Sequence, residues 1–486
     1  MPKIVVLWTD AVVLGLVLLL AVYVWRATRQ PLLRARWHKV FSDAPALCSS
    51  LLLAVFMLFT VLDSLHFRRA LPTAPGAAAA YDTRTQSVLD VLLQPLIDRR
   101  EATYSAPLAY RGFVKESDVD RPEAGRAFPR LVHGGAHLKD PATQWEGDLL
   151  MRAAGGLAGG VALSLAGGLL LALWAGRSAG VGMGMGMGMG MPMGMGHGWR
   201  LLLTDRTALP LRALWITWCV FALLVGVMFA LAMGYHVLGT DRTGNDVLYQ
   251  ALKSIRTAFV IGALATLATL PFAIVLGVMA GYFKGWVDEL IQYVYTVLSS
   301  VPFILLIAAC VLMMQVYMDK NAELFETGAE RADVRIFLLC VIVGVTGWAG
   351  LCRLLRGETL KLRELDYVQA ATAFGVSHWK IMARHILPNV MHLVLITTVL
   401  SFSDLILFEA VLSYIGIGVD PSMNSFGGMI NQARGEIARD PMVWWSFAAA
   451  FVFMVSLVLA ANLFADGVRD AFDPRARSLR VRSVRA

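Results

Sequence analysis

The 486-residue sequence has little charge and few cysteines, and these shortages exclude several classes of protein. Charged side chains make up 16% and hydrophobic side chains 57% of the residues, and the mean hydropathy is +0.62. A soluble core of ordinary proportions cannot bury so much apolar surface. The five cysteines fall in or beside apolar runs without Cys-x-x-Cys spacing, which predicts small buried hydrophobes rather than metal ligands. The sequence therefore predicts an integral membrane protein.

Chemistry-bearing motifs are also missing. The sequence contains no Gly-x-x-x-x-Gly-Lys-Ser/Thr phosphate loop, so any energy from ATP must arrive through another subunit. No Ser/His/Asp, metal-ligand or paired-acid constellation stands out. The net charge of +8 comes from arginines that gather in loops on one side of a consistent topology, which favours membrane orientation over nucleic-acid binding. We therefore expect no enzyme activity, no cofactor or metal bound by this chain and no nucleic-acid partner.

Long apolar runs predict an all-α fold with about nine transmembrane helices. The predicted spans are 5–25, 44–64, 154–176, 210–234, 257–281, 291–317, 335–352, 391–418 and 443–465. If they alternate, the dense basic charge at 26–39, 361–384 and 475–485 lies on one side, which is then the cytoplasm, and the N-terminus lies outside. The first span lacks a strongly basic n-region and a small-residue cleavage site, which favours a retained helix over a signal peptide.

A polar, basic segment between two apolar runs predicts two helices joined by a turn. Ala370 and Ala371 offer small side chains on the first helix, and Gly375 stands where a helix must end and turn. Leu387 and Pro388 follow where the next span begins. This pattern closely resembles the Glu-Ala-Ala, Gly, Ile-x-Leu-Pro coupling loop of permease subunits of bacterial ATP-binding-cassette (ABC) importers.

The resemblance assigns a role to residues 359–390, which we call the coupling loop. It implies that the loop docks on a separate cytoplasmic ATPase. Gln369 stands where the family has Glu, and His385 stands where it has Ile, with Ile386 adjacent. The predicted coupling residues are Gln369, Ala370, Ala371, Gly375, Ile386, Leu387 and Pro388.

Two further motifs resemble the dipeptide and oligopeptide branch of this family. Residues 238–246, which we call the outer-face motif, resemble its Leu-Gly-Thr-Asp-x-x-Gly-Arg-Asp signature, with Asn245 in place of Arg. The motif predicts either an element near a binding-protein dock or gate, or a structured turn before a short interfacial helix. Its candidate residues are Gly239, Thr240, Asp241, Gly244 and Asp246. The sequence from Asn462 to Arg475 resembles the family's C-terminal ending.

Three residues in apolar runs are candidates for a translocation pathway. Pro302 interrupts one run and predicts a kink. Asp404 and Glu409 lie in another, where carboxylates are expensive unless they face a cavity or a partner. Five residues apart on a helix, they are about 140° apart and cannot share one face. Glu409 falls in a run that resembles the family; Asp404 does not, and pairing with a neighbouring helix is its alternative.

The resemblance also divides the chain. Residues 1–180 form an accessory N-terminal unit of about three helices with an outer loop at 65–153, which is either a folded cap or an insertion without substrate contact. Residues 181–204 form a Gly/Met-rich linker, in which a Cu(I) site is conceivable but flexible glycine favours a plain linker. Residues 205–475 form an importer core of type I from the last six helices, and 476–486 a basic cytoplasmic tail.

The implied protein is the second permease subunit of an importer in the bacterial inner membrane. Its implied partners are a paralogous permease, ATPase subunits that bind ATP and Mg, an extracytoplasmic solute-binding protein and the lipid bilayer. A peptide, a peptide-like antibiotic, nickel or an opine is compatible as solute. The remaining alternatives are a secondary transporter without an ATPase, and a membrane scaffold or sensor with a permease-like core.

Overall fold

The fold is almost entirely helical. The computed structural model describes residues 3–71, 81–117, 126–183, 195–204, 207, 209–325 and 327–472. The helices are α1 (Trp8–Arg29), α2 (Pro31–Phe41), α3 (Ala44–Asp63), α4 (Val88–Leu92), α5 (Gln94–Ile97), α6 (Pro141–Met183), α7 (Met195–Thr204), α8 (Leu211–Ala232), α9 (Val247–Phe283), α10 (Gly285–Ser300), α11 (Phe303–Lys320), α12 (Gly328–Gly347), α13 (Ala349–Arg363), α14 (Asp366–Ala373), α15 (His378–Ile381), α16 (Leu387–Tyr414), α17 (Phe426–Ile437) and α18 (Trp445–Phe472).

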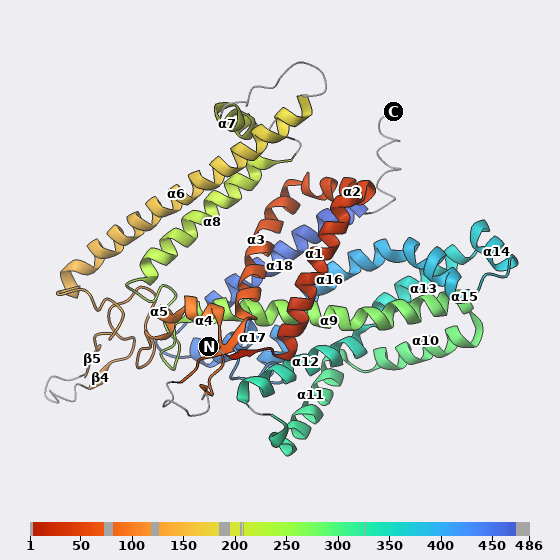
Figure 1. Cartoon of the computed structure of the whole chain (residues 1–486). Helices are drawn as coiled ribbons and strands as arrows, with labels where there is room; N and C mark the ends of the chain where they lie inside the picture. Colours follow the sequence, from red (N-terminus) through yellow and green to blue (C-terminus); the bar gives the residue numbers. More distant parts are fainter. Residues whose placement is uncertain are drawn as a thin grey trace, which may run out of the picture.

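Short strands occur only near the N-terminus and between α3 and α6 in the described part of the chain. They form a three-stranded antiparallel sheet, β1-β2-β3, and a separate antiparallel pair, β4-β5. Their bounds are β1 (Lys3–Val5), β2 (His66–Arg68), β3 (Gln86–Ser87), β4 (Glu116–Ser117) and β5 (Arg126–Ala127). The rest of the architecture is a bundle of long helices (Figure 1).

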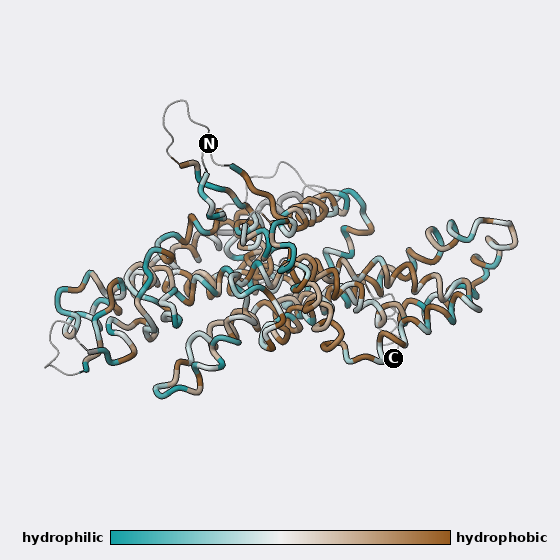
Figure 2. The backbone as a smooth tube through the Cα atoms, turned by 90° about the horizontal axis from the view of Figure 1, so that it is seen from below, coloured by the Kyte–Doolittle hydropathy of each residue, from teal (hydrophilic) through white to brown (hydrophobic). Residues whose placement is uncertain are grey.

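The expected number of membrane spans is confirmed. Among the described residues, eight helices are long and apolar enough to cross a membrane, and α12 with α13 makes a ninth span if the pair, bent by 40°, is counted as one. Along the tube of Figure 2, apolar colour follows the long helices and polar colour gathers at turns and loops. The chain is therefore a multi-pass membrane protein.

Helix α9 is the centre of the bundle. α3, α12, α13 and α16 all pack against it. Two α9 glycines allow the closest approach, because a Cβ at Gly277 would lie 2.9 Å from the carbonyl oxygen of Cys352, and one at Gly281 would lie 2.6 Å from Cβ of Thr359. Backbones can pack this tightly only where side chains are small. α9 and α13 therefore form a close pair.

The first three predicted spans divide between two neighbours. α3 packs against α9 and α18, whereas α6 packs against α8 as a hairpin that stands beside the bundle in Figure 1. The backbones of the two helices meet directly where Gly156 and Gly160 of α6 face Gly226 of α8. The indole of Trp215 also donates to the carbonyl of Ser164 at 3.1 Å. The division of the chain at 181–204 stays a prediction, since residues 184–194 of the Gly-Met repeat and the tail from 473 lie outside the described residues.

Two local predictions differ from the structure. The predicted span 291–317 is two helices, α10 and α11, separated at Val301 and Pro302, so Pro302 precedes α11 rather than kinking a span. The predicted interfacial helix after the outer-face motif is the first part of α9. Its residues Val247 and Ile255 are 0% and 1% exposed, because α17 and α18 cover them.

Candidate functional sites: the coupling loop and the outer-face motif

The coupling loop folds as two short helices with a glycine turn. α14 ends at Ala373, and Gly375 has φ of 72°, in the left-handed region that favours glycine. The amide of Val376 donates to the carbonyl of Ala371 at 3.1 Å, which satisfies an orphan carbonyl at the helix end. α15 then passes through one π-helical turn (Met382–Ile386) into α16, with Pro388 in its first turn. The predicted turn at Gly375 is confirmed.

The loop has a buried side and an exposed side. Val368 and Ile386 are 1% and 0% exposed, and together with Ile381 they pack into an apolar cluster with α9 and α13. Gln369 and Ala370 are exposed, and Gln369 Nε2 donates to the carbonyl of Glu364 at 3.2 Å. Gly375 and Pro388 are exposed as well, and Ala371 and Leu387 are half-buried. The predicted coupling residues thus form much of the surface of the loop.

Hydrogen bonds tie the loop to the end of α9. Tyr282 Oη lies 2.8 Å from His378 Nδ1 of α15, and an Arg363 guanidinium N–H donates to the carbonyl of Tyr282 at 2.6 Å. Lys284 Nζ pairs with Glu364 at 2.7 Å. The loop is therefore attached to one end of α9 through α15 and through the end of α13.

Sequence reasoning did not identify two exposed aromatic residues of the loop. The side chains of Phe374 and Trp379 flank the glycine turn, and the residues are 86% and 64% exposed. Large exposed aromatics at a polar loop are typical of protein contacts. Their position beside Gly375 places them in the turn, but the sequence does not distinguish an exposed aromatic there from a buried one.

The two carboxylates of α16 lie in different environments. Glu409 is 1% exposed and accepts a hydrogen bond of 2.7 Å from Ser413 Oγ. Asp404 is exposed and makes no hydrogen bond or ion pair with any described residue. Pro302 is exposed at the start of α11. The structure thus separates Asp404 from Glu409, and a pathway role for each of the three stays a prediction.

The outer-face motif is a hydrogen-bonded turn that starts α9. Asp246 is the N-cap residue, and its Oδ1 accepts from the amides of Leu248 and Tyr249 at 2.8 and 3.3 Å. Asp241 Oδ1 accepts from the amides of Thr243 and Asn245 at 2.8 and 2.9 Å. The motif is therefore a rigid turn that ends in a capped helix.

The motif is covered by the segment between α3 and α6, residues 64–140, which we call the α3–α6 segment. Thr240 is 0% exposed, and its hydroxyl accepts from the amide of Ser105 at 2.6 Å and donates to the carbonyl of Thr103 at 2.9 Å. From the other side, the indole of Trp445 donates to the carbonyl of Thr240 at 2.9 Å. The outer loop of the N-terminal unit is thus packed onto the core.

A buried carboxylate organises this contact. Glu101 accepts from the amides of Val132, His133 and Gly134 at 2.9, 2.8 and 3.0 Å, and its Oε1 lies 3.4 Å from His236 Nε2. The other ring nitrogen of His236 lies 2.8 Å from Asp246. An imidazolium between two carboxylates therefore joins the α3–α6 segment to the cap of α9.

We expect this contact to weaken as the pH rises. Burial alone would lower the pKa of His236, but hydrogen bonds to Asp246 and Glu101 outweigh it and raise that pKa from 6.5 to about 9. The imidazolium contributes stability that is present below pH 6.5 and lost through pH 9, on the order of 3 kcal/mol at 1.4 kcal/mol per pKa unit. The protection factors of residues 99–113 against hydrogen exchange, taken relative to the intrinsic exchange rate at each pH, should therefore fall between pH 6.5 and 9. His236→Gln should remove this dependence; an unchanged pH profile in that variant would contradict the assignment.

Gly244→Ala should release the α3–α6 segment. Gly244 has φ of 79°, and a Cβ there would lie 1.8 Å from the carbonyl oxygen of Glu101. This oxygen is a main-chain atom, so the clash can be relieved only by displacing the backbone. Strain of about 1–3 kcal/mol predicts roughly fivefold to a hundredfold faster proteolysis of this segment. Gly285→Ala is the matched control, with φ of 57° and nothing within 4 Å of its Cβ. Equal proteolysis of the two variants would contradict the docked arrangement.

In the described part of the chain, no cluster of three or more His, Cys, Asp or Glu side chains is placed to hold a metal ion. The candidate functional features are therefore the coupling loop, the exposed carboxylate of Asp404 in α16 and the outer-face motif, which the α3–α6 segment covers.

Comparisons with known proteins agree on one family. Residues 273–478 match the family described as binding-protein-dependent transport system inner membrane component. The chain is 32% identical over 244 residues to the oligopeptide transport system permease protein OppC of Haemophilus influenzae, covering 50% of this chain and 72% of that protein. It is 33% identical over 250 residues to OppC of Mycobacterium bovis, covering 51% and 79%.

Two further proteins are similar to this chain. The chain is 33% identical over 243 residues to the glutathione transport system permease protein GsiD of Pectobacterium atrosepticum, covering 50% of this chain and 74% of that protein. A solved structure of the MetNI methionine ABC transporter in inward-facing conformations covers 47% of this chain and 96% of its own, with 17% identity and a TM-score of 0.34.

Proposed function

The chain belongs to the dipeptide/oligopeptide family of ABC importer permeases, and we propose that it is one of two paralogous permease subunits of an importer for peptides or related small solutes. The observation that carries the proposal is the coupling loop, whose glycine turn and exposed aromatics form a surface fixed to the central helix. Relatives that are named as permeases for oligopeptides and for glutathione support peptides and related small molecules as the class of solute.

The energy source is a separate ATPase that docks on the coupling loop. Phe374 and Trp379 offer apolar surface for that contact, and Ala370 leaves room for close helix approach. The bonds from Arg363 and His378 to Tyr282 transmit movement of the loop to α9. Closure of the ATPase pair then rocks α9 and its neighbours between outward and inward access.

The coupling loop lies in the cytoplasm of a bacterium, and the chain crosses the inner membrane with its N-terminus outside. The positive-inside rule supports this orientation. The basic helix α2 contacts the end of α18, since Lys39 Nζ donates to the carbonyl of Asp470 at 2.6 Å. Helix α2 and the end of α18 therefore lie on the same side. The outer-face motif and the α3–α6 segment lie at the start of α9, opposite the coupling loop.

Asp404 marks the face of α16 that meets the pathway or the second permease. A carboxylate within a span is expensive against lipid, and this one has no partner among the described residues. Glu409 is buried, its Oε1 accepts from Ser413, and its Oε2 has no hydrogen-bond partner among the described residues. Water, solute or the partner permease then supplies polar contacts to the Asp404 carboxylate.

Uptake of a labelled tripeptide by cells that carry or lack the chain tests the proposed function. We expect the deletion to abolish ATP-dependent uptake, and the restored chain to recover it. Uptake that persists without ATP but needs the chain would favour a secondary transporter. Unchanged uptake of peptides and related solutes in the deletion would favour a scaffold or sensor.

A further inference from the structure

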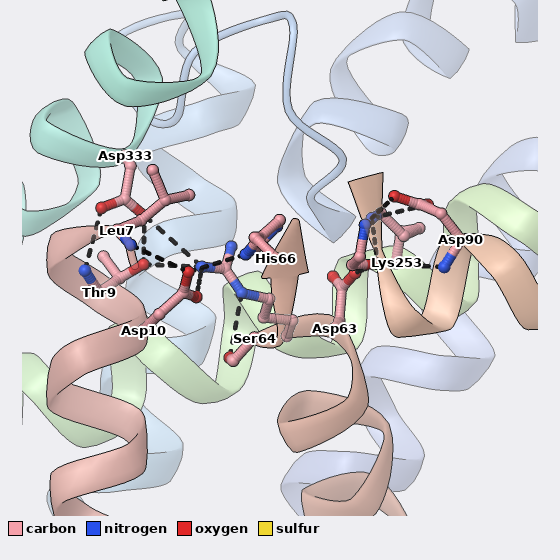
Figure 3. A network of polar contacts seen from close by, with 11 residues as sticks. Leu7, Thr9, Asp10, Asp63, Ser64, His66, Asp90, Lys253 and Asp333 are labelled. Atoms are coloured by element: carbon pink, nitrogen blue, oxygen red, sulfur yellow. Dashed lines mark hydrogen bonds and ion pairs between the residues drawn. The ribbon is translucent and has the colours of Figure 1, made fainter. Parts of the chain in front are cut away.

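Two cationic side chains of α9 hold the N-terminal helices at one end of the bundle (Figure 3). Arg256 is the first, and its side chain is 4% exposed. One guanidinium nitrogen donates to Asp10 Oδ1 at 2.6 Å and to Thr9 Oγ1 at 2.8 Å, both in α1. Its Nε donates to Ser64 Oγ at 3.3 Å, directly after α3. One guanidinium thus reaches both N-terminal helices.

A second helix of the core joins the same cluster. Asp333 of α12 is 0% exposed and lies 3.5 Å from Arg256. Its carboxylate accepts from the amide of Thr9 at 3.0 Å. On the other side, His66 Nδ1 of β2 lies 2.7 Å from Asp10 Oδ2. The start of α1 is therefore held between α9 and α12.

Lys253 is the second cation, and it lies nearly one helical turn before Arg256 on the same helix. Its ammonium lies 2.6 Å from Asp63 Oδ1 at the end of α3, and 2.9 Å from Asp90 Oδ1 of α4. Ser87 Oγ donates to Asp63 at 2.6 Å. Figure 3 shows the Lys253 and Asp10 groups side by side above α1 and α3.

The opposite end of the α1–α3 hairpin is also attached to the core. Trp37 of α2 stacks on Phe464 at 6.4 Å between ring centroids and meets Phe472 edge-on at 5.6 Å. A Cβ at Gly467 of α18 would lie 2.4 Å from Cβ of Ala46 in α3. The hairpin is thus fixed to the bundle at both ends.

We propose that Arg256 and Lys253 are positioning residues that fix the α1–α3 hairpin to α9, so that the hairpin and α9 move as one body during transport. This inference rests on the proposed function only for the existence of a transport cycle. The physical reason is that buried charges are tolerated when paired, and sliding α9 past the hairpin would leave several carboxylates and two cations unpaired. Because the other end of α9 contacts the coupling loop, the N-terminal helices become part of the moving unit.

Distance measurements across the cycle test the proposal. Spin labels on noncanonical amino acids at Leu18 of α1 and Val275 of α9, which are 66% and 50% exposed, leave the five native cysteines in place. The assembled importer is measured without nucleotide and trapped with ATP and vanadate. A reference pair joins Val275 to the partner permease.

The expected result is a changed reference distance with an unchanged distance between Leu18 and Val275. A change of both distances would overturn the proposal. An unchanged reference distance, or no partner permease at all, would instead count against the proposed function, so the two failures are distinguishable.

Substitutions at the anchor test the proposal without relying on a transport cycle. Arg256→Met should broaden the distribution of distances between Leu18 and Val275. Arg256→Lys keeps the charge and should keep the distribution nearly as narrow as in the parent. Arg331→Met is the matched control, because Arg331 pairs with Asp319 at an exposed site. A narrow distribution in Arg256→Met, or equal broadening in the control, would overturn the role of Arg256.

A transport readout separates positioning from simple stability. In folded protein of equal amount, we expect Arg256→Met to lower uptake per ATP hydrolysed at least tenfold, and Arg256→Lys to recover it to within about threefold of the parent. If Arg256→Met lowers only the amount of folded protein and leaves this ratio unchanged, the residue does not position the moving unit.

Discussion

Gly375→Val is expected to lower solute uptake about tenfold or more while the protein remains inserted in the membrane. Gly375 has φ of 72°, where a β-branched residue is strained by about 1–3 kcal/mol. Since 1.4 kcal/mol corresponds to a factor of ten in an equilibrium constant, the glycine turn and the helices on either side should leave their docking geometry. The measurement is uptake together with ATP hydrolysis in the reconstituted importer, where uptake should fall more than hydrolysis.

A matched variant separates backbone strain from crowding. A Cβ at Gly375 would meet nothing within 4 Å, so a larger side chain has room. Gly375→Asn should therefore retain most uptake, because asparagine tolerates the left-handed region. Normal uptake by Gly375→Val would contradict the coupling role of the loop. Equal loss in both variants would show that the docked ATPase fills the space beside the glycine.

Asp404→Leu is expected to lower uptake about tenfold to a hundredfold with little effect on the amount of inserted protein. A hydrogen bond to a charged group contributes about 1.5–3 kcal/mol, and the exposed carboxylate is available to solute, water or the partner permease. The measurement is initial uptake rate against protein amount in the same membranes.

Asp404→Glu is the control, because it keeps the charge on the same face of α16 and should retain most uptake. If Asp404 faced lipid, Asp404→Leu would instead stabilise the protein and leave uptake unchanged. That outcome would remove Asp404 from the pathway and from the interface with the partner.

Local chemistry made the coupling loop predictable from the sequence. Glycine at 375 and proline at 388 act through the backbone of their own turns, so their roles could be inferred without knowledge of the fold. The lengths of the apolar runs likewise predicted the spans. Phe374 and Trp379 were missed because an exposed aromatic is distinguished from a buried one only by the packing around it.

Contacts between distant segments could not be predicted in the same way. The ion pair of Arg256 with Asp10 joins residues 246 positions apart, and no periodicity in either helix specifies the other as its partner. The break between α10 and α11 lies inside one apolar run, so hydropathy alone merged the two helices. Thr240 is buried because the α3–α6 segment packs on it through Ser105. The sequence of the outer-face motif gives no sign of that contact.

Affinity purification of the tagged chain from its native membrane in mild detergent tests whether the chain is part of an ATP-driven importer. Co-purifying subunits are identified, and ATP hydrolysis is measured with the parent chain and with Gly375→Val. We expect a paralogous permease and one or two ATPase subunits, with hydrolysis by the parent complex and altered coupling in the variant. Recovery of the chain alone and without associated ATP hydrolysis would contradict the proposed importer.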